Sequence, residues 1–229
     1  MIDQLHKEHR QRMKKRFKKF GLDSFQDHEA LELLLFYALP YKNTNGIAHE
    51  MLNKFGSFSG VFSANAEELK SISGIGDHAA LLIELIPALF RRYSADVMSK
   101  NAKYEGNDCI SEYVINHFIG QTKEHVQLFL FDSSMRRIDS ITVYDGHFGS
   151  VGVNSESIAE YVFSNKASGF VIAHNHPSGD VTPSYEDMCV TRKIYRDLAV
   201  LNREMIEHYI VADGKCNPIL DKAKELFDK

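Results

Sequence analysis

The stretch AHNHPSGDVTPSYED, residues 173–187, decides how the second half of the chain folds. It follows the apolar run GFVIA, residues 169–173, which is typical of a buried strand. Because side chains alternate along a strand, His174 and His176 should point to the same side where this strand ends. Imidazole is the commonest metal ligand in proteins, so the pair indicates half of a tetrahedral metal site.

The residues after this pair supply a turn and a third candidate ligand. Residues 177–183 are rich in proline and glycine, and Ser-Tyr-Glu-Asp at 184–187 predicts the start of a helix. The turn can bring Asp187 back toward the histidines. Two histidines and one carboxylate leave one zinc position open for water, which is the catalytic pattern. The sequence therefore predicts Zn²⁺ bound by His174, His176 and Asp187.

The same residues also have a purely structural interpretation. Ser184 and Asp187 have the spacing of a helix capping box, and residues 175–179 could form only a turn. A capping role is compatible with a ligand role, because a helix start restricts the rotamer of the carboxylate. The combination of strand, turn and acid at a helix start favours a metal site over the structural alternative.

Zinc hydrolysis also needs a general base near the metal that is not bound to it. Glu124 begins the first strand expected in the same half of the chain, and we expect it to fill this role. As a residue on its own it could equally be a solvated charge at a strand end. The rival candidates are Asp180, Glu186 and Asp145.

Composition describes an ordinary globular chain with an uneven charge. The 229 residues are 44% hydrophobic and carry a net charge of −4, which excludes a general nucleic-acid binder. Residues 1–20, however, hold eight Lys and Arg against Asp3 and Glu8, a net charge of +6. This basic segment predicts an anionic partner such as DNA, which residues 7–19 would contact. A solvated Lys-rich helix explains the segment equally well.

Cysteine usage and the N-terminus predict a cytoplasmic protein. Cys109, Cys189 and Cys216 are widely spaced and odd in number, so no disulfide framework is expected. The charged N-terminus is unlike a signal peptide. The apolar stretch at residues 33–39 is too short to cross a bilayer, so no membrane association is expected.

The pattern of elements predicts two domains, residues 1–100 and residues 101–229. The first domain is predicted to be all α-helical, and its last helix should run from Asp77 to about Tyr93. Residues 94–107 are polar and should form the linker. The second mixes strands and helices irregularly. It predicts an α/β domain with a mixed, mostly antiparallel sheet flanked by helices.

Residues 74–76, Gly-Ile-Gly, lie between two expected helices and resemble the turn of a helix-hairpin-helix. Such a turn lets the backbone approach a phosphate closely and without regard to base sequence. DNA-binding hairpins usually carry Lys or Arg just after the second glycine, whereas this chain has Asp77 and His78. A packing role is favoured over DNA contact, and both are retained.

Residues 174–187 resemble the JAMM motif of MPN-type zinc isopeptidases: His-x-His-Pro, six residues, Ser, two residues, Asp. With Asn175 and residues 178–180, Ser-Gly-Asp, the stretch is more specifically similar to the bacterial RadC family, which also has a helical N-terminal part. The resemblance implies a cytidine-deaminase-like, JAMM-type fold and zinc on His174, His176 and Asp187. It also implies Glu124 as the catalytic acid and base, and Ser184 as a donor to the oxyanion of a tetrahedral intermediate.

The sequence thus predicts a RadC-like zinc metallopeptidase or isopeptidase acting on a peptide or isopeptide substrate. A non-catalytic, DNA-repair-associated accessory protein is the alternative, and a zinc phosphoesterase or nuclease is a third hypothesis. Two positions depart from the family pattern: Gly146-His147 stands where a Gly-Thr turn is usual, and Glu207-His208 where an Asp-His pair is frequent. His147 and His208 are candidates for groups behind the ligands.

Overall fold

The computed structural model describes residues 2–99, 107–146, 148 and 153–226. The chain separates into two compact units, Met1–Leu89 and Phe90–Lys229. The predicted domain boundary at residues 100 and 101 lies outside the described residues. Among the described residues, no helix is both long enough and apolar enough to cross a bilayer.

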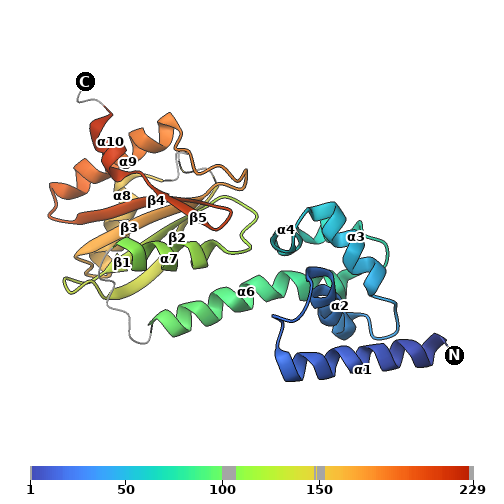
Figure 1. Ribbon diagram of the computed structural model, residues 1–229. Helices are drawn as coiled ribbons and strands as arrows, with labels where there is room; N and C mark the ends of the chain where they lie inside the picture. Colours follow the sequence, from blue (N-terminus) through green and yellow to red (C-terminus); the bar gives the residue numbers. More distant parts are fainter. Residues whose placement is uncertain (1, 100–106, 147, 149–152, 227–229) are drawn as a thin grey trace. The chain divides into compact units, whose positions relative to one another are not determined.

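The regular structure described in the first unit is helical, in agreement with the prediction (Figure 1). Its helices pack around a core that includes Leu35, Met51 and Ile83, each almost completely buried. Arg10 ties α1 to the end of α2, since its guanidinium donates to the carbonyl of Leu39 at 2.7 Å. The helices are α1 (Ile2–Phe20), α2 (Asp27–Ala38), α3 (Asn45–Phe55), α4 (Phe58–Ser63), α5 (Ala66–Lys70) and the first part of α6 (Asp77–Ser99).

The Gly-Ile-Gly turn before α6 is packed against α3. Gly74 has a φ of +94°, and a Cβ there would lie 2.9 Å from Cδ1 of Ile47. Ile75 is buried in the core of the first unit. Asp77, just after the turn, lies 3.3 Å from Nζ of Lys70. These contacts explain Gly74 by packing, whereas a Cβ at Gly76 would meet nothing within 4 Å.

The second unit contains a five-stranded sheet in the order β2-β1-β3-β4-β5. β3 and β4 pair in parallel, and the other neighbouring pairs are antiparallel, as the predicted mixed, mostly antiparallel sheet requires. The strands are β1 (His125–Phe131), β2 (Arg137–Asp145), β3 (Gly169–Asn175), β4 (Glu204–Ala212) and β5 (Lys215–Pro218).

Helices cover both faces of this sheet (Figure 1). α7 (Asn107–Phe118) packs on one face, while α8 (Ser155–Ser164), α9 (Tyr185–Ala199) and α10 (Leu220–Glu225) belong to the core on the other. Every residue of β3 is buried, because this strand lies in the middle of the sheet with helices on both sides. The central position explains the continuous apolar run that precedes His174.

The end of α6 and the presence of β5 differ from expectation. α6 continues to Ser99, beyond the predicted end near Tyr93, so residues 94–99 are helical although they lack an apolar face. β5 was not predicted, because its four residues are too few to show an alternating pattern. A short strand expected around residues 150–153 falls largely on residues outside the described part.

Candidate metal centre

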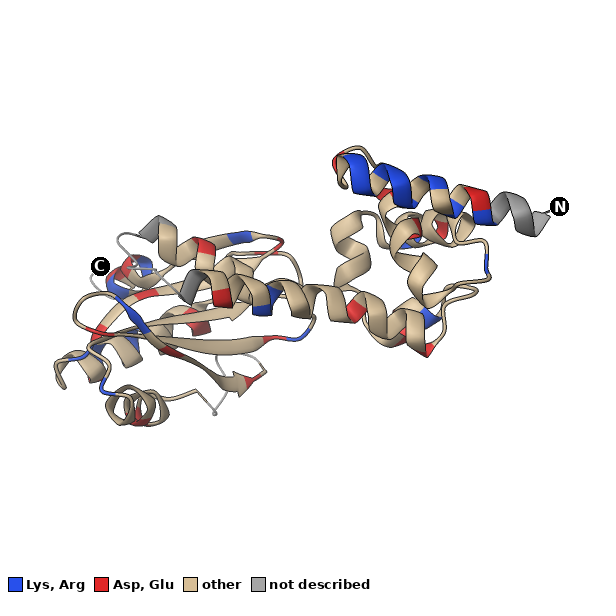
Figure 2. Cartoon of the chain, turned by 90° about the horizontal axis from the view of Figure 1, so that it is seen from below, with Lys and Arg blue, Asp and Glu red and all other residues tan. Residues whose placement is uncertain are grey.

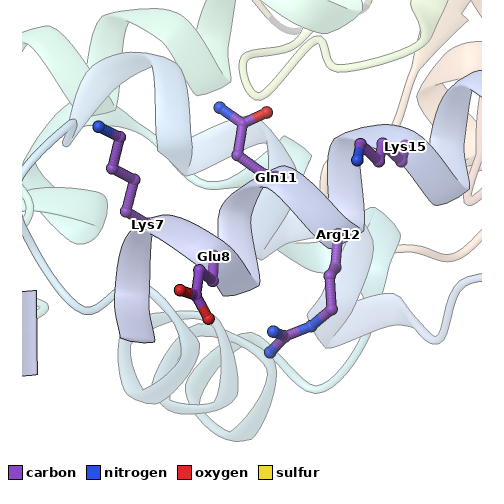
Figure 3. A pocket seen from close by; sticks show the side chains of 5 residues that line it. All are labelled: Lys7, Glu8, Gln11, Arg12 and Lys15. Atoms are coloured by element: carbon purple, nitrogen blue, oxygen red, sulfur yellow. The ribbon is translucent and has the colours of Figure 1, made fainter. Parts of the chain in front are cut away.

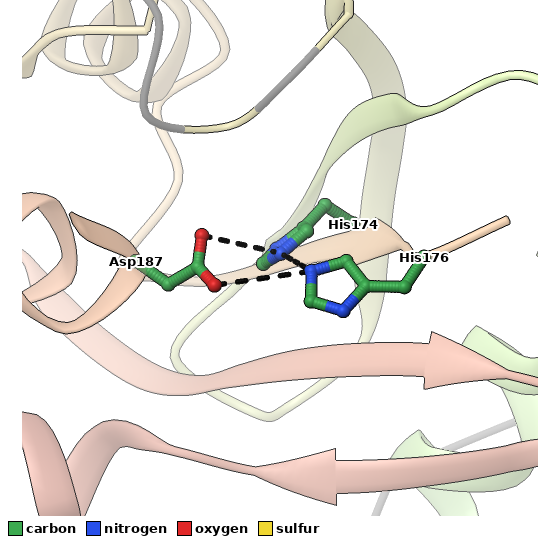
Figure 4. Close-up of side chains that lie close together, drawn as sticks. All are labelled: His174, His176 and Asp187. Atoms are coloured by element: carbon green, nitrogen blue, oxygen red, sulfur yellow. Dashed lines mark hydrogen bonds and ion pairs between the residues drawn. The ribbon is translucent and has the colours of Figure 1, made fainter. Parts of the chain in front are cut away.

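The end of β3 and the start of α9 bring three candidate ligands together (Figure 4). His174 is the penultimate residue of β3, His176 follows the strand, and Asp187 is in the first turn of α9. The connecting turn bends at Gly179, whose φ is +86° and whose missing Cβ would lie 2.8 Å from a carboxylate oxygen of Asp213. The local signals that predicted a strand, a turn and a capped helix therefore position all three side chains.

Four candidate ligand atoms, one nitrogen from each imidazole and the two oxygens of the carboxylate, lie close together. Nε2 of His174 lies 3.0 Å from Nε2 of His176, and the two nitrogens lie 3.6 and 3.8 Å from Oδ1 and Oδ2 of Asp187. Ligands about 2.0–2.1 Å from a tetrahedral zinc ion lie about 3.3 Å from one another. The distances of 3.0–3.8 Å between these atoms are close to the spacing of ligands around a tetrahedral zinc ion.

Asp187 is a completely buried carboxylate that is only partly satisfied. Its Oδ2 accepts a hydrogen bond from the backbone N–H of Ser184 at 2.7 Å, and its own N–H donates to Oγ of Ser184 at 3.0 Å. Oδ1 has no hydrogen-bond partner among the described residues. A buried carboxylate oxygen without a partner is costly unless a cation lies beside it. The predicted capping box is present, and it leaves one oxygen aimed at the histidines.

The ring nitrogen of His176 that faces away from His174 and Asp187 has a partner that fixes its proton. Nδ1 lies 2.7 Å from the backbone carbonyl of Asp180, which can only accept, so Nδ1 carries the hydrogen. With the hydrogen on Nδ1, Nε2 is the nitrogen that can present a lone pair to His174 and Asp187. The side chain of His176 is 15% exposed, whereas those of His174 and Asp187 are completely buried, so the centre opens to solvent on the His176 side.

Glu124 is linked to the centre through Phe148. Its Oε1 accepts a hydrogen bond from the N–H of Phe148 at 2.9 Å. The ring of Phe148 stacks on the ring of His174, with centroids 5.0 Å apart and planes 7° from parallel. Val126, two residues after Glu124, pairs with His174 across the antiparallel β1–β3 ladder. Glu124 therefore lies at the same end of the sheet as the candidate ligands.

Asn175, between the two histidines, holds the segment that carries Glu124. Its side-chain oxygen accepts from the N–H of His125 at 2.9 Å, and its amide donates to the carbonyl of Lys123 at 2.9 Å. The stretch on both sides of Glu124 is thus fastened to the strand that carries His174. This role was not predicted, since it depends on pairing between β1 and β3 rather than on local sequence.

The rival acids are engaged elsewhere or exposed. The pKa of Asp180 is lowered by hydrogen bonds from Thr182, first from its side chain and then from its backbone N–H, which donates to the carboxylate at 2.8 Å. Asp145 lies 2.6 Å from Nδ1 of His125, and Glu186 is exposed at the start of α9. Ser184 is also exposed, and its Oγ serves as the N-cap acceptor of α9.

Two further residues lie behind His174. Nε2 of His208, on β4, is 2.9 Å from Nδ1 of His174, and Nδ1 of His208 is 2.6 Å from Oγ1 of Thr191, on α9. Complete burial, with His174 and His176 close by, lowers the pKa of His208 well below its usual range. Thr191 was not predicted, although its spacing of four residues from Asp187 places both on one face of α9. His147 lies outside the described residues.

Known proteins resemble this chain over most of its length. The family profile described as "RadC-like JAB domain" matches residues 105–223. A UPF0758 protein of Fusobacterium nucleatum subsp. nucleatum is 30% identical over 223 residues, covering 93% of this chain and 95% of the relative. UPF0758 proteins of Cupriavidus taiwanensis and Cupriavidus necator are 26% and 27% identical, each over at least 90% of both chains. The chain belongs to the RadC-like JAB domain family.

Proposed function

We propose that the protein is a zinc-dependent hydrolase of amide bonds, with a peptide or isopeptide as its substrate. The observation that carries the proposal is the triangle formed by Nε2 of His174, Nε2 of His176 and the carboxylate of Asp187. Two imidazole nitrogens and one carboxylate are the donors of catalytic zinc sites. The unpartnered buried Oδ1 of Asp187 and the facing histidine lone pairs are both stabilised by a cation.

His174, His176 and Asp187 would hold the zinc ion. When bound, zinc would lower the pKa of a water molecule and polarise the carbonyl of the substrate. The partly exposed edge of His176 leaves the substrate a way in, while the burial of His174 and Asp187 keeps bulk water from the inner side.

Glu124 would accept the proton of the attacking water and pass it to the leaving amine. A general base must lie close to the metal and keep its own geometry, and the hydrogen bond from Phe148 N–H restrains the Glu124 carboxylate. Ser184 would donate its hydroxyl hydrogen to the developing oxyanion. Its oxygen already accepts from Asp187 N–H, which orients the hydroxyl at the head of α9.

The test compares Glu124→Gln with the exposed control Glu186→Gln. Glutamine keeps the acceptor for Phe148 N–H but cannot take a proton. We expect Glu124→Gln to retain zinc and to lose roughly 10²–10⁴-fold in the release of amines from a peptide and isopeptide pool. Glu186→Gln should match the wild type in zinc content and rate. Undiminished hydrolysis by Glu124→Gln would refute its role.

A phosphoester is the rival electrophile. Among the described residues, His174, His176 and Asp187 form the single cluster of three or more potential metal ligands, so the ligand set suits one ion. Phosphoester hydrolysis by paired metals needs a second ion about 3.5–4 Å away. This observation favours the amide substrate.

We also propose that the protein works in a reducing compartment, the cytoplasm. The free thiols of Cys109, Cys189 and Cys216 support this proposal.

The helical first unit supports a second function, the binding of DNA through α1. Basic residues gather along this helix (Figure 2). Lys7, Arg12 and Lys15 are exposed and line an open pocket together with Glu8 and Gln11 (Figure 3). These cations are separate from Arg10 and Arg16, which hold α1 to the rest of the first unit through the carbonyl of Leu39 and the carboxylate of Glu29.

Binding to duplex DNA at several salt concentrations tests this function. A contact with a phosphate adds about 0.9 to the slope of log K against log salt. Replacing Lys7, Arg12 and Lys15 by Gln should therefore lower the magnitude of that slope by about 2–3. The matched control is Lys193→Gln, Lys222→Gln and Lys224→Gln in the second unit, which should leave the slope unchanged. Equal slopes for wild type and the α1 variant would exclude this face as the DNA contact.

A further inference from the structure

A chain of hydrogen bonds runs from the backbone of Asp187 to the ring of His174 and fixes where each hydrogen lies. Oγ1 of Thr191 is 2.5 Å from the carbonyl oxygen of Asp187. A carbonyl oxygen only accepts, so the hydroxyl of Thr191 donates its hydrogen to it. The lone pairs of Thr191 Oγ1 then remain for another donor.

That donor is His208. Its Nδ1 lies 2.6 Å from Oγ1 of Thr191, so Nδ1 carries a hydrogen and donates it. The ring of His208 is completely buried, and its two nitrogens contact the hydroxyl of Thr191 and the imidazole of His174, neither of which is an anion. A buried imidazole without an anionic partner is neutral. A neutral imidazole with hydrogen on Nδ1 has a lone pair on Nε2.

The lone pair of His208 determines the tautomer of His174. Nε2 of His208 lies 2.9 Å from Nδ1 of His174, so Nδ1 of His174 must donate. Nε2 of His174 is left with a lone pair, and this is the nitrogen that faces His176 and Asp187. The chain of donors thus ends with the His174 nitrogen in the state that can bind a metal.

The chain lies entirely in the protein interior. Asp187, Thr191, His208 and His174 are all completely buried. Water therefore cannot replace any partner, and the opposite tautomer of either histidine would leave a buried group unsatisfied. Phe148 holds both rings in place, with its centroid 5.0 Å from that of His174 and 4.5 Å from that of His208.

We propose that Thr191 and His208 are positioning residues that hold His174 in its Nδ1–H tautomer and so preset the centre for zinc. The inference deepens the proposed function and, as far as zinc affinity is concerned, rests on it. Thr191 and Asp187 lie on the same helix, α9. This helix therefore supplies the ligand Asp187 directly and orients the ligand His174 through His208 on β4. Groups of this kind typically change metal affinity by about 10–100-fold when removed.

The first measurement is made on wild-type protein stripped of metal by a chelator. Nitrogen-15 NMR of the histidine rings distinguishes the two neutral tautomers directly, and single variants assign the signals. We expect hydrogen on Nδ1 and a bare Nε2 in both His174 and His208. Hydrogen on Nε2 of His174 would overturn the inference, whatever the protein does with zinc.

The second measurement compares Thr191→Val with Thr191→Ser. Valine has the shape of threonine without its hydroxyl, whereas serine keeps the hydroxyl. Competition with a fluorescent zinc chelator should show about 10–100-fold weaker zinc binding for Thr191→Val and recovery in Thr191→Ser. Equal zinc affinity in the two variants would refute the positioning role while leaving the proposed hydrolase intact.

The two proposals can fail separately. Wild-type protein that shows the expected tautomers but binds no zinc would refute the zinc hydrolase and leave the hydrogen-bond chain standing as the determinant of the His174 tautomer. A loss of thermal stability in Thr191→Val without any loss of zinc affinity would identify Thr191 as structural only, against the inference.

Discussion

Replacing His176 by Ala should abolish the stabilisation of the protein by zinc while changing the zinc-free protein little. His176 is the most exposed of the three candidate ligands and lies just beyond the end of β3. Without zinc, the substitution removes the hydrogen bond from Nδ1 to the carbonyl of Asp180, together with the Nε2 contacts to His174 and Asp187. The loss should be about 1 kcal/mol of unfolding free energy.

The effect of zinc on the wild type should be larger. Zinc at about 100 times its dissociation constant stabilises the folded state by about 2.7 kcal/mol. For a unit of this size, each kcal/mol shifts Tm by roughly 2–4 °C, which predicts a rise of roughly 5–11 °C. The variant has only His174 and Asp187 left as ligands, so its Tm should not respond to zinc at the same concentration.

Thermal unfolding with zinc or with a chelator measures both effects. His125→Ala is the matched control, since His125 pairs with the exposed Asp145 on the neighbouring strand and should leave the zinc response unchanged. A zinc-induced rise in His176→Ala as large as that of the wild type would refute the reasoning. A zinc response lost in the control as well would also contradict it.

Three further predictions concern other parts of the fold. Ser184→Ala should lower Tm, because removing an N-cap acceptor costs about 1 kcal/mol, and should also slow hydrolysis at unchanged zinc content; equal rates would exclude the oxyanion role. Burial lowers the pKa of His117 to about 4 from an ordinary 6.5, so the folded state resists protonation. The free energy of unfolding should therefore fall as the pH drops from about 6.5 to about 4, by about 3 kcal/mol at most. Chemical denaturation at several pH values should show a weaker pH dependence for His117→Gln. Gly74→Ala should destabilise the protein by about 1–3 kcal/mol in chemical denaturation, because φ at Gly74 is positive and the added Cβ meets Ile47. The control Gly76→Ala should be nearly neutral, because a Cβ at Gly76 would meet nothing within 4 Å.

Local patterns predicted that His174, His176 and Asp187 would lie close together, and the structure confirms this proximity, while metal binding stays a prediction. His174 and Asp187 could be placed from sequence because an apolar run ends at one and a capping box begins just before the other. Both signals depend on neighbours within a few residues, and the turn between them is short. The all-helical first unit and the mixed sheet of the second followed from the same kind of periodicity.

Contacts that depend on pairing between distant segments could not be derived from local sequence, although His208 had been named as a candidate for a group behind the ligands. Thr191 and His208 meet only because β4 pairs in parallel with β3 and α9 packs on β4. The clamp by Asn175 requires the register between β1 and β3. Glu124 could be singled out only through the resemblance to a family, because a lone acid at a strand end carries no local signal of its chemistry.

X-ray absorption at the zinc edge, on protein loaded with one equivalent of zinc, tests the central claim most directly. The account predicts stoichiometric zinc surrounded by nitrogen and oxygen atoms at about 2.0–2.1 Å, with the outer-shell scattering of two imidazole rings. A sulfur atom at about 2.3 Å, or the absence of bound zinc after loading, would contradict a centre built from His174, His176 and Asp187.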